Sequence, residues 1–361
     1  MKYCKGCGIL LQNINTNEKG YIVDLINQDY CLRCFKLKNY NQLVDIEFDL
    51  NSVYKKIESV IADKATKNRY FYVIDVIDVK GSRLPSIENL LKNEDVIFCI
   101  NKIDIFPNVI DNDKIYDYVI NQLEDTPIIN KNIILLSSKQ LNTIDNLIKI
   151  INSKECDNYF IGVSNTGKSS LLNSCLKQQN KSQDIITSYH TNTTLDIINI
   201  NLGLNNKVYD TPGLQISKSI LNAIDKKNWK HFAYNDELKQ FTYQLKINNS
   251  IICEKIMWLE LLESNREVIS FHFWTNKHNI LHRTNSKNVQ KYLDNNDEKL
   301  IKTISSKFIK KVFYFKDNND INIVVSGIGW ISFKTHVGLK IAINTPYLED
   351  NEVYIYKTNN N

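Results

Sequence analysis

The stretch from Phe160 to Asn173 constrains the fold of this chain most, because it contains the pattern G-x-x-x-x-G-K-[ST]. In this phosphate-binding loop, glycines let backbone N–H groups surround phosphate oxygens, the lysine contacts the β- and γ-phosphates, and the hydroxyl binds Mg²⁺. An apolar run precedes the loop and an amphipathic run follows it. This predicts a strand, the loop, and then a helix whose N-terminus faces the anion. The candidate residues are Gly162, Asn165, Thr166, Gly167, Lys168, Ser169 and Ser170, with Ser169 as the Mg²⁺ ligand.

The composition is that of an ordinary globular protein. The chain has 361 residues, of which 43% are hydrophobic and 24% charged, and it is long enough for two or three domains. All apolar runs are shorter than the roughly 18 residues that a membrane span needs. The N-terminal residues show neither a signal-peptide core nor a transit segment. These features predict a cytoplasmic protein that does not enter a membrane.

Two C-x-x-C pairs near the N-terminus predict a metal site. Cys4 and Cys7 form the first pair, and Cys31 and Cys34 form the second. Each pair can present two thiolates from a tight turn, and two pairs complete the tetrahedral set that zinc prefers. The redox alternative needs a C-x-x-C beside a βαβ unit, which is absent here. The other cysteines lie in contexts that favour simple packing: Cys99, Cys156, Cys175 and Cys253.

Two motifs that read guanine lie before the phosphate loop. Residues 101–104 match N-K-x-D and follow an apolar run, Val96 to Ile100, that predicts a buried strand. The Asp carboxylate can accept from guanine N1–H and the N2 amine, which adenine lacks, and the Asn can reach the N7/O6 edge. A second run, Asn132 to Leu136, ends at S-[AS]-K, whose backbone contacts guanine O6. Open α/β sheets bind ligands at such strand ends. The candidate guanine-binding residues are Asn101, Lys102, Asp104, Ser137, Ser138 and Lys139.

Two motifs that sense the γ-phosphate follow the loop. The threonine-rich stretch Thr187 to Asp196 contains Thr194, a candidate Mg²⁺ ligand, and residues 210–213 match D-x-x-G. Asp210 would hold Mg²⁺ through water, and the Gly213 N–H would bond to the γ-phosphate. We therefore predict Lys168, Thr194 and Gly213 as the catalytic residues.

The five motifs of a GTPase are thus present in an unusual order, because the two guanine motifs precede the phosphate loop. A sheet tolerates this order if the original termini are adjacent and joined, a role that suits the helix predicted over 141–151. The sequence predicts an α/β fold: a circularly permuted P-loop GTPase domain over residues 46–220. A zinc-binding domain (1–45) precedes it, and a basic C-terminal α+β domain (221–361) follows it.

The C-terminal region carries the positive charge. Residues 271–340 contain 12 Lys and Arg against 5 Asp and Glu, about +7, while the rest of the chain sums to about −2. This favours a polyanionic partner, although a solvated basic face is the alternative. Basic and aromatic residues alternate over Lys310 to Lys316, as in RNA-binding sheets; a sheet with one aromatic core face has the same pattern. We expect this run to form a hairpin with Ile321 to Val325, and we expect helices over Ile251 to Asn265 and Lys287 to Leu300.

Beyond these motifs, the chain resembles the YqeH family of ribosome-assembly GTPases over nearly its whole length. The resemblance rests on Cys31 to Asn41, Asp75 to Ser82, His282 to Thr284 and Ser326 to Trp330. It implies a GTP-hydrolysing switch that helps to mature the small ribosomal subunit and contacts its rRNA, with GTP or GDP, Mg²⁺ and Zn²⁺ bound. We expect a monomer. One departure is visible, since the family's P-G-T-T reads T-N-T-T over 191–194, which keeps the Mg²⁺ ligand but changes the loop that carries it.

The residue after D-x-x-G is Leu214, where Ras-like enzymes place a Gln that orients water. The resemblance groups this chain with GTPases that have a hydrophobic residue here, several of which use K⁺ to supply the charge of an arginine finger. Their K⁺ ligand is an Asn in the phosphate loop, and Asn165 stands at that position, although an Asn-rich chain can also place one there by chance. We therefore predict slow intrinsic hydrolysis that K⁺ stimulates.

Three functions remain open. The first is a GTPase whose nucleotide state controls binding to an assembling ribosomal particle. The second is a nucleic-acid- or peptide-binding protein in which the GTPase domain is mainly structural. The third is a metabolic enzyme that uses GTP, but the sequence lacks the second set of acid, base or nucleophile that such an enzyme needs.

Overall fold

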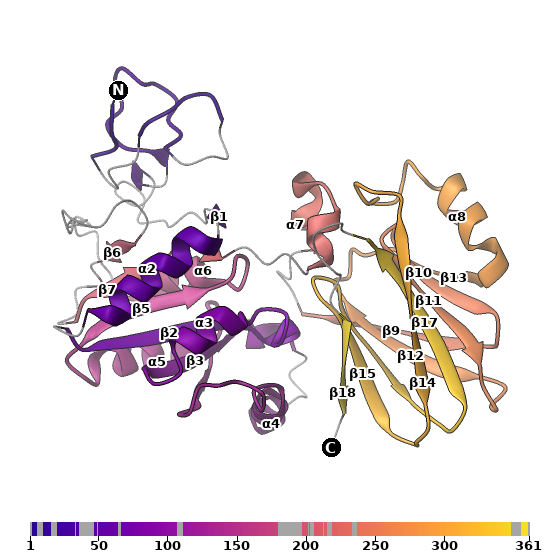
Figure 1. Cartoon of the computed structure of the whole chain (residues 1–361). Coiled ribbons are helices and arrows are strands. Elements are labelled where there is room, and N and C mark those ends of the chain that lie inside the picture. Colours follow the sequence, from indigo (N-terminus) through magenta and orange to yellow (C-terminus); the bar gives the residue numbers. More distant parts are fainter. Residues whose placement is uncertain are drawn as a thin grey trace. The chain divides into compact units, whose positions relative to one another are not determined.

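A computed structural model defines the fold of the chain (Figure 1). It describes residues 2–5, 10–15, 20–32, 34–35, 47–48, 50–63, 66–106, 111–179, 197–200, 202, 206–211, 213–214, 219–232, 237–347 and 355–359. The chain forms two compact units, Met1–Asp104 with Asn112–Ile216, and Ile105–Asp111 with Ser217–Asn361. The segment Ile105–Asp111 belongs to the second unit although it directly follows the N-K-x-D motif. None of the helices in the described ranges has the length and hydropathy needed to cross a bilayer.

The first unit is built on a six-stranded sheet with the order β4-β3-β2-β5-β7-β6. Its strands are β2 (Asn68–Asp75), β3 (Asp95–Asn101), β4 (Asn132–Leu135), β5 (Asp157–Gly162), β6 (Ile198–Ile200) and β7 (Val208–Asp210). All neighbours are parallel except β6, which pairs antiparallel with β7. The phosphate loop follows β5 in the middle of the sheet, although the chain enters the sheet at β2. This strand order confirms the predicted circularly permuted P-loop fold.

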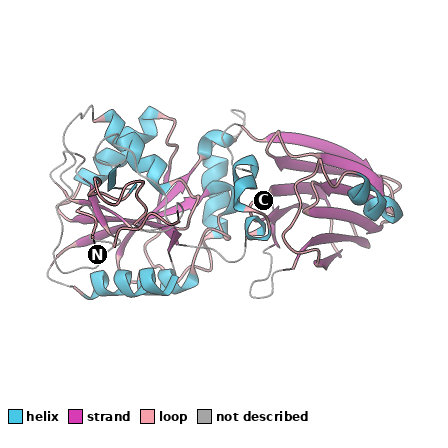
Figure 2. Ribbon diagram, turned by 90° about the horizontal axis from the view of Figure 1, so that it is seen from above, coloured by secondary structure: helices cyan, strands magenta, loops and turns pink. Residues whose placement is uncertain are grey.

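Helices cover both faces of this sheet (Figures 1 and 2). They are α2 (Leu50–Ala62), α3 (Pro85–Leu90), α4 (Asn112–Gln122), α5 (Leu141–Asn152) and α6 (Lys168–Gln178), with short 3₁₀ turns η1 (Val76–Asp78) and η2 (Ile103–Ile105). Because both faces are covered, β2 reads as a continuous apolar run and its interior residues are all buried. On one face α5 and α6 pack against Phe71 and Val73. The Phe71 ring stacks on Phe160 of β5 at 4.7 Å.

The second unit is sheet-rich and contains two five-stranded sheets, β13-β10-β11-β17-β14 and β18-β15-β16-β12-β9. The strands are β9 (Lys239–Leu245), β10 (Asn249–Cys253), β11 (Met257–Glu263), β12 (Ile269–Thr275), β13 (Leu281–Asn285), β14 (Phe308–Phe315), β15 (Asp320–Val325), β16 (Gly329–Lys334), β17 (Leu339–Pro346) and β18 (Ile355–Asn359). The helical elements are η3 (Ile220–Ala223), η4 (Lys226–Asn228), α7 (Trp229–Phe232), η5 (Ser286–Asn288) and α8 (Val289–Asn295). Burial alternates along β12 and β16, and one core joins inward residues of both sheets, including Phe271, Phe333 and Ile341. This is the arrangement of two sheets packed face to face.

The predicted helix over Ile251 to Asn265 is wrong, because this run forms the antiparallel pair β10 and β11. Residues of β11 alternate between buried and partly exposed, the period of a strand. The turn between the strands contains Glu254 at φ +51°. Its buried carboxylate accepts from the backbone N–H groups of Ile280 at 2.9 Å and Ile301 at 3.0 Å. These long-range bonds fix the turn, and the residues near Glu254 in the sequence do not predict them.

The predicted hairpin between Lys310–Lys316 and Ile321–Val325 is also wrong. Strand β14 pairs with β17 in one sheet, and β15 pairs with β16 and β18 in the other, so the chain crosses between sheets. Phe313 packs against the core and Phe315 is part of it, and the Lys357 ammonium lies over both rings, at 5.1 and 4.7 Å. Phe313 and Phe315 therefore follow the alternative of a core face, whereas Tyr314 is exposed on the other face of the strand. The helix predicted over 287–300 is shorter, with α8 confined to Val289–Asn295.

The turn from Ser326 to Trp330 is a junction within the second unit. The Ser326 carbonyl accepts from the Ile220 N–H at 3.2 Å. The Trp330 ring contacts Phe106 at 5.7 Å and stacks on Trp274 at 5.6 Å. Gly329 has φ +130°, and a Cβ there would lie 2.1 Å from the Trp274 carbonyl oxygen, so only glycine fits. This stretch is one of those that carry the family resemblance. It contacts two segments that are distant in sequence, one at Phe106 and one at Ile220.

The cysteines outside the N-terminal pairs are buried, which confirms that they pack as small apolar groups. Burial raises the pKa of the Cys175 thiol to about 12. It also raises the pKa of Cys99 and Cys253 well above the ordinary value of a thiol. These thiols therefore stay protonated near neutral pH and are poor nucleophiles and metal ligands.

Candidate functional site

The ends of three strands bring the predicted motifs together. Strands β3, β5 and β7 run in the same direction, so their carboxyl ends meet at one edge of the sheet. There β3 ends at Asn101, β5 leads into the phosphate loop, and β7 ends at Asp210. Open parallel sheets bind their ligands at this edge. The permuted motifs thus converge although they are far apart along the chain.

The phosphate loop has a conformation that restricts side chains at two positions. Gly167 has φ +87°, and a Cβ there would lie 2.3 Å from Asn101 Nδ2. A Cβ on Gly162 would lie 2.7 Å from the Val73 carbonyl oxygen. Thr166 is buried, and its hydroxyl donates to the Val163 carbonyl at 2.9 Å. The loop therefore lies tightly against its neighbours with a bare backbone, which is the form that cradles an anion.

The first two residues of N-K-x-D contact the phosphate loop directly. Asn101 is 1% exposed, and its Nδ2 donates to the Thr166 carbonyl at 2.8 Å. Because a carbonyl only accepts, this bond fixes the orientation of the amide and leaves one N–H for the acceptors on the guanine N7/O6 edge. Lys102 Nζ donates to the Asn165 carbonyl at 2.6 Å. The base-reading and phosphate-binding segments are thereby tied together.

The carboxylate of Asp104 is positioned by the second guanine motif. Ser137 Oγ donates to Asp104 Oδ1 at 2.7 Å, and Lys139 Nζ lies 2.8 Å from Oδ2. The Ser138 carbonyl accepts from Ser174 Oγ of α6 at 2.7 Å. Residues of the second motif therefore hold the carboxylate that is predicted to distinguish guanine from adenine.

The Mg²⁺ side of the site is buried. Lys168 and Asp210 are 3% and 1% exposed, and the Lys168 ammonium donates to the Asp210 carboxylate and to the Thr211 carbonyl. Ser169 is also buried, and Ser170 is exposed. Gly213 lies in β8 (Gly213–Leu214), which pairs with β1 (Glu47–Phe48). A Cβ on Gly213 would lie 2.9 Å from Ser164 Oγ, so the D-x-x-G glycine lies directly against the phosphate loop.

One residue at this edge was not among the predicted site residues. Asp75 ends β2, and its carboxylate accepts from Lys102 Nζ at 2.6 Å and from the Ile77 N–H at 3.0 Å. It fixes the lysine whose stem is expected to cover the base. The sequence does contain a signal for Asp75, because it ends a buried apolar run in the same way as Asn101 ends the next one. Two such strands that pair in parallel place their last residues side by side.

The residues present fit a guanine nucleotide with Mg²⁺. Two buried polar atoms at the site, Asn101 Oδ1 and Ser164 Oγ, have no hydrogen-bond partner among the described residues. The Ser169 hydroxyl and the Asp210 carboxylate are the hard oxygen donors that Mg²⁺ prefers. Thr194 and the rest of Thr187 to Asp196 lie outside the described residues, as do Pro212 and Cys7.

Three of the four predicted zinc ligands form a cluster. The sulfur atoms of Cys4, Cys31 and Cys34 lie within 4.8 Å of one another, and all three residues are buried. The Cys31 N–H donates to Cys4 Sγ at 3.1 Å, a bond that stabilises a thiolate. The apolar residues around them are few, chiefly Leu11 and Ile22. So small a core needs a covalent or metal staple, which the donor set can provide.

Two protein families match this chain. The family described as RsgA GTPase matches residues 87–219, a range that runs from the N-K-x-D motif through the phosphate loop to D-x-x-G. The family described as 50S ribosome-binding GTPase matches residues 157–304, beginning at the strand of the phosphate loop. The first match contains the motifs in the order found here.

The decisive relative is a protein of Bacillus subtilis (strain 168) named as uncharacterized protein YqeH. It is 26% identical over 344 residues, which are 91% of this chain and 92% of the relative. This chain is a YqeH homologue. The match spans both structural units, so the homology includes the sheet-rich second unit as well as the P-loop GTPase domain of the first.

Shorter matches extend to plants. This chain is 26% identical over 247 residues to the NO-associated protein 1, chloroplastic/mitochondrial, of Arabidopsis thaliana. The match covers 59% of this chain and 43% of the relative. A putative nitric oxide synthase of Oryza sativa subsp. japonica matches at 26% identity over 59% of this chain and 44% of its own length. The solved structure of YjeQ from Thermotoga maritima matches at 24% identity and a TM-score of 0.27, covering 40% of this chain and 48% of that one, a likeness too low to carry weight.

Replacement of Asp104 by Asn should weaken GTP binding by about 10²-fold or more, because two hydrogen bonds to a charged carboxylate are lost at about 1.5–3 kcal/mol each. The Asn amide can instead donate to the C2 carbonyl of xanthine, so XTP should become the preferred nucleotide. The measurement is the Kd for fluorescent GTP and XTP. Asp117→Asn, an exposed change on α4, serves as the matched control. Unchanged GTP affinity in Asp104→Asn would contradict the assignment.

Proposed function

We propose that this YqeH homologue is a GTP-hydrolysing switch that acts in assembly of the small ribosomal subunit by binding the particle or its RNA. The observation that carries the proposal is the contact of Asn101 and Lys102 with the phosphate loop. It places the segment proposed to select guanine directly against the loop proposed to bind the phosphates. The match to a family described as 50S ribosome-binding GTPase and the resemblance to the YqeH family over both units support the ribosomal role. The description of one matching family names the 50S subunit, so a separate experiment must decide between the small and the large ribosomal subunit.

The residues of the site suit slow hydrolysis. Lys168 places a buried positive charge where phosphate charge develops, and the Gly213 N–H adds a donor for the γ-phosphate. Ser169, Asp210 and Thr194 would hold Mg²⁺, which supplies further charge neutralisation when bound. Leu214 is fully buried, and its carbonyl accepts from the Ser164 N–H at 2.8 Å. An alkyl side chain in that position cannot orient the attacking water, so Leu214 does not contribute to fast intrinsic turnover.

The missing positive charge can come from K⁺. Asn165 in the phosphate loop is exposed and has φ +70°. Its carbonyl is taken by Lys102, which holds the residue in place beside the phosphates. We assign its side chain the role of K⁺ ligand. The N-terminal cysteines are assigned to one structural zinc ion, with Cys7 completing the set of Cys4, Cys31 and Cys34.

The purified chain should contain about one zinc ion, because four thiolates complete a tetrahedral site. Cys31→Ser should reduce the zinc content strongly and expose the N-terminal segment to proteolysis. Metal content by mass spectrometry tests this. Cys156→Ser, which changes a buried cysteine outside the cluster, should retain the metal. Loss of zinc from both variants, or its absence from the unchanged protein, would count against the site.

GTP hydrolysis should be faster in K⁺ than in Na⁺, by about tenfold if the ion stabilises the transition state by ~1.4 kcal/mol. Asn165→Ala should lose this advantage and keep the rate measured in Na⁺. Phosphate release at equal ionic strength in the two salts is the measurement. Equal rates in K⁺ and Na⁺ for the unchanged protein would remove Asn165 from the mechanism.

Binding to ribosomal subunits should depend on the nucleotide. We expect co-sedimentation with small subunits to differ between a GTP analogue and GDP by roughly 5- to 150-fold in affinity, the usual range for coupling between sites. Lys168→Ala should abolish the difference. Equal sedimentation in both states would favour the alternative of a structural GTPase domain on a binding protein. Preferential sedimentation with the large subunit would show that the protein acts on the large and not on the small ribosomal subunit.

A further inference from the structure

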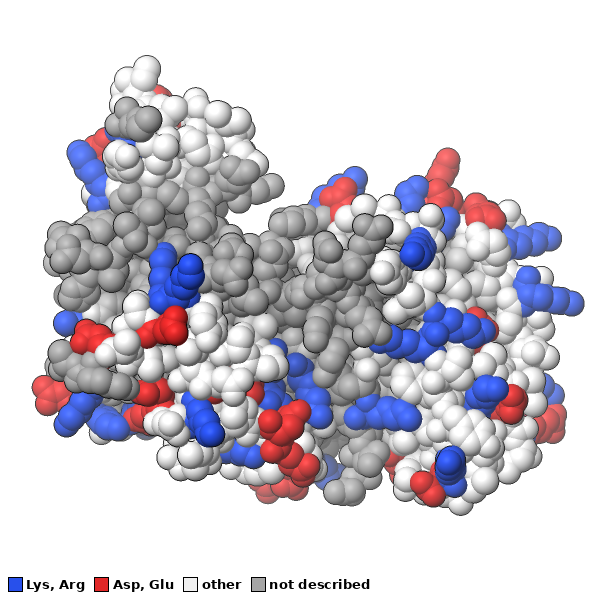
Figure 3. All heavy atoms as spheres, viewed as in Figure 1, with Lys and Arg blue, Asp and Glu red and all other residues white. Residues whose placement is uncertain are grey.

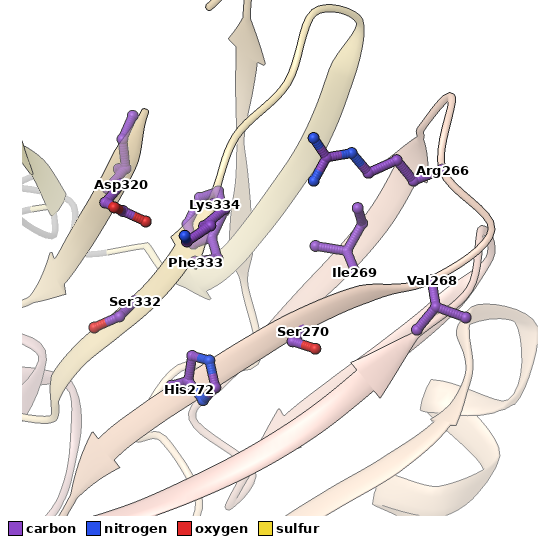
Figure 4. A pocket seen from close by; sticks show the side chains of 10 residues that line it. Arg266, Val268, Ile269, Ser270, His272, Asp320, Ser332, Phe333 and Lys334 are labelled. Carbon is purple, nitrogen blue, oxygen red and sulfur yellow. The ribbon is translucent and has the colours of Figure 1, made fainter. Parts of the chain in front are cut away.

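One sheet of the second unit is hollowed at one end, where polar and apolar residues line the surface together. Along β12 and β16 every second residue points away from the core, so Ser270, His272 and Ser332 lie on the outer face. His272 pairs with Ser332 across the two strands. A hollow of about 300 Å³ opens here, and its rim carries Arg266 and Lys334 (Figure 4). We call this the Arg266–Lys334 groove. Its other lining residues are polar (Ser270, His272, Ser332 and Asp320) and apolar (Val268, Ile269, Ile321 and Phe333).

Arg266 and Lys334 differ from three lysines of the second unit in their ion pairing. Lys246, Lys310 and Lys340 form ion pairs with glutamates at 2.6, 2.7 and 2.8 Å. Figure 3 likewise shows acidic residues interspersed with the basic ones over the visible face of the second unit. Arg266 and Lys334 are exposed and have no ion-pair partner within the described part of the chain. Asp320 is the cross-strand neighbour of Lys334, so the groove carries two cations against one carboxylate, and this net positive charge favours an anionic ligand.

The floor of the groove offers uncharged hydrogen-bonding groups. His272 Nδ1 lies 2.9 Å from Gln240 Nε2 and 2.8 Å from the Thr242 hydroxyl. Because an amide nitrogen only donates, Nδ1 is the acceptor in this contact, which leaves Nε2 as the N–H of the ring. The ring therefore presents an N–H donor beside the hydroxyls of Ser270 and Ser332. Donors of this kind suit the sugar and base edges of a nucleic acid strand.

The polar surface continues beyond the groove. A second hollow of about 380 Å³ adjoins it, with Val268 lining both. Arg283 and Gln244 lie in this second hollow, and Arg283 Nη1 donates to the Gln244 carbonyl at 3.0 Å. Arg283 belongs to the stretch His282 to Thr284 that carries part of the family resemblance. An extended chain with repeated charges can follow such a track, whereas a small anion would need only one hollow.

We infer that the Arg266–Lys334 groove binds the backbone of single-stranded RNA, with phosphates at the two cations and ribose or base edges at Ser270, His272 and Ser332. This inference rests on the proposed function and names the surface that contacts RNA. Asp320 can accept a hydrogen bond from a ribose 2′-OH, a group that an acidic peptide lacks, and this favours RNA. The surface differs from the basic and aromatic strand β14 that the sequence pattern favours.

The test is fluorescence anisotropy of the full chain with a labelled single-stranded RNA oligomer over a range of salt concentrations. Loss of two phosphate contacts in Arg266→Gln/Lys334→Gln should lower the salt slope by about 1.4 and weaken binding by about 25-fold at 0.1 M salt. The matched control is Lys291→Gln/Lys299→Gln, which removes two exposed charges elsewhere in the same unit. It should bind RNA as the unchanged protein does.

Three outcomes would overturn the inference: equal loss in both double variants, no loss in the groove variant, or equal binding of DNA or poly-glutamate of the same length. GTP hydrolysis should be unchanged in the groove variant, which shows that the chain is folded. If the unchanged protein hydrolyses GTP and sediments with subunits but binds no RNA oligomer, the groove assignment alone fails. If hydrolysis and sedimentation both fail, the proposed function fails.

Discussion

The contact between Asn101 and the phosphate loop is the constraint on which the first unit depends. The two bonded residues are 65 positions apart, yet they meet because β2 pairs with β3 on one side and with β5 on the other. Strand adjacency, and not chain order, determines which loops share the carboxyl edge of the sheet. Permutation is therefore tolerated, since α5 simply carries the chain from the edge strand β4 back to the central strand β5.

Buried carboxylates hold irregular segments in both units. In the first, Glu88 is 1% exposed and receives two bonds from Arg83 and one from Thr126, at 2.6, 2.8 and 2.8 Å. In the second, Glu254 accepts from two backbone N–H groups of distant loops. Removal of one partner from such a buried pair costs about 3–5 kcal/mol, because the remaining charge stays desolvated. These segments are thus fixed by charge as well as by apolar packing.

Much of the first unit could be predicted from sequence, because each strand is a buried apolar run that ends in a chemically specific motif. The second unit has no such markers. The apolar spacing of Ile251 to Asn265 suits a helix, but the run forms two strands that pair with each other and with the distant strands β13 and β17, and remote bonds of Glu254 fix the turn between them. The sheet partner of β14 and the pairing of Asp75 with Lys102 likewise depend on residues far away in sequence. The Arg266–Lys334 groove could not be predicted from the sequence, because its lining residues come from three strands and a turn.

The segment Ile105–Asp111 makes the second unit discontinuous in sequence. The Ile105 carbonyl accepts from the Leu238 N–H at 2.8 Å, and Phe106 packs on Trp330. A fragment that begins at residue 217 would lack both groups and would expose one face of an indole. A fragment that ends at 216 would carry them without their partners. The two units therefore cannot be separated by a single cut, because the chain passes between them three times, after Asp104, after Asp111 and after Ile216.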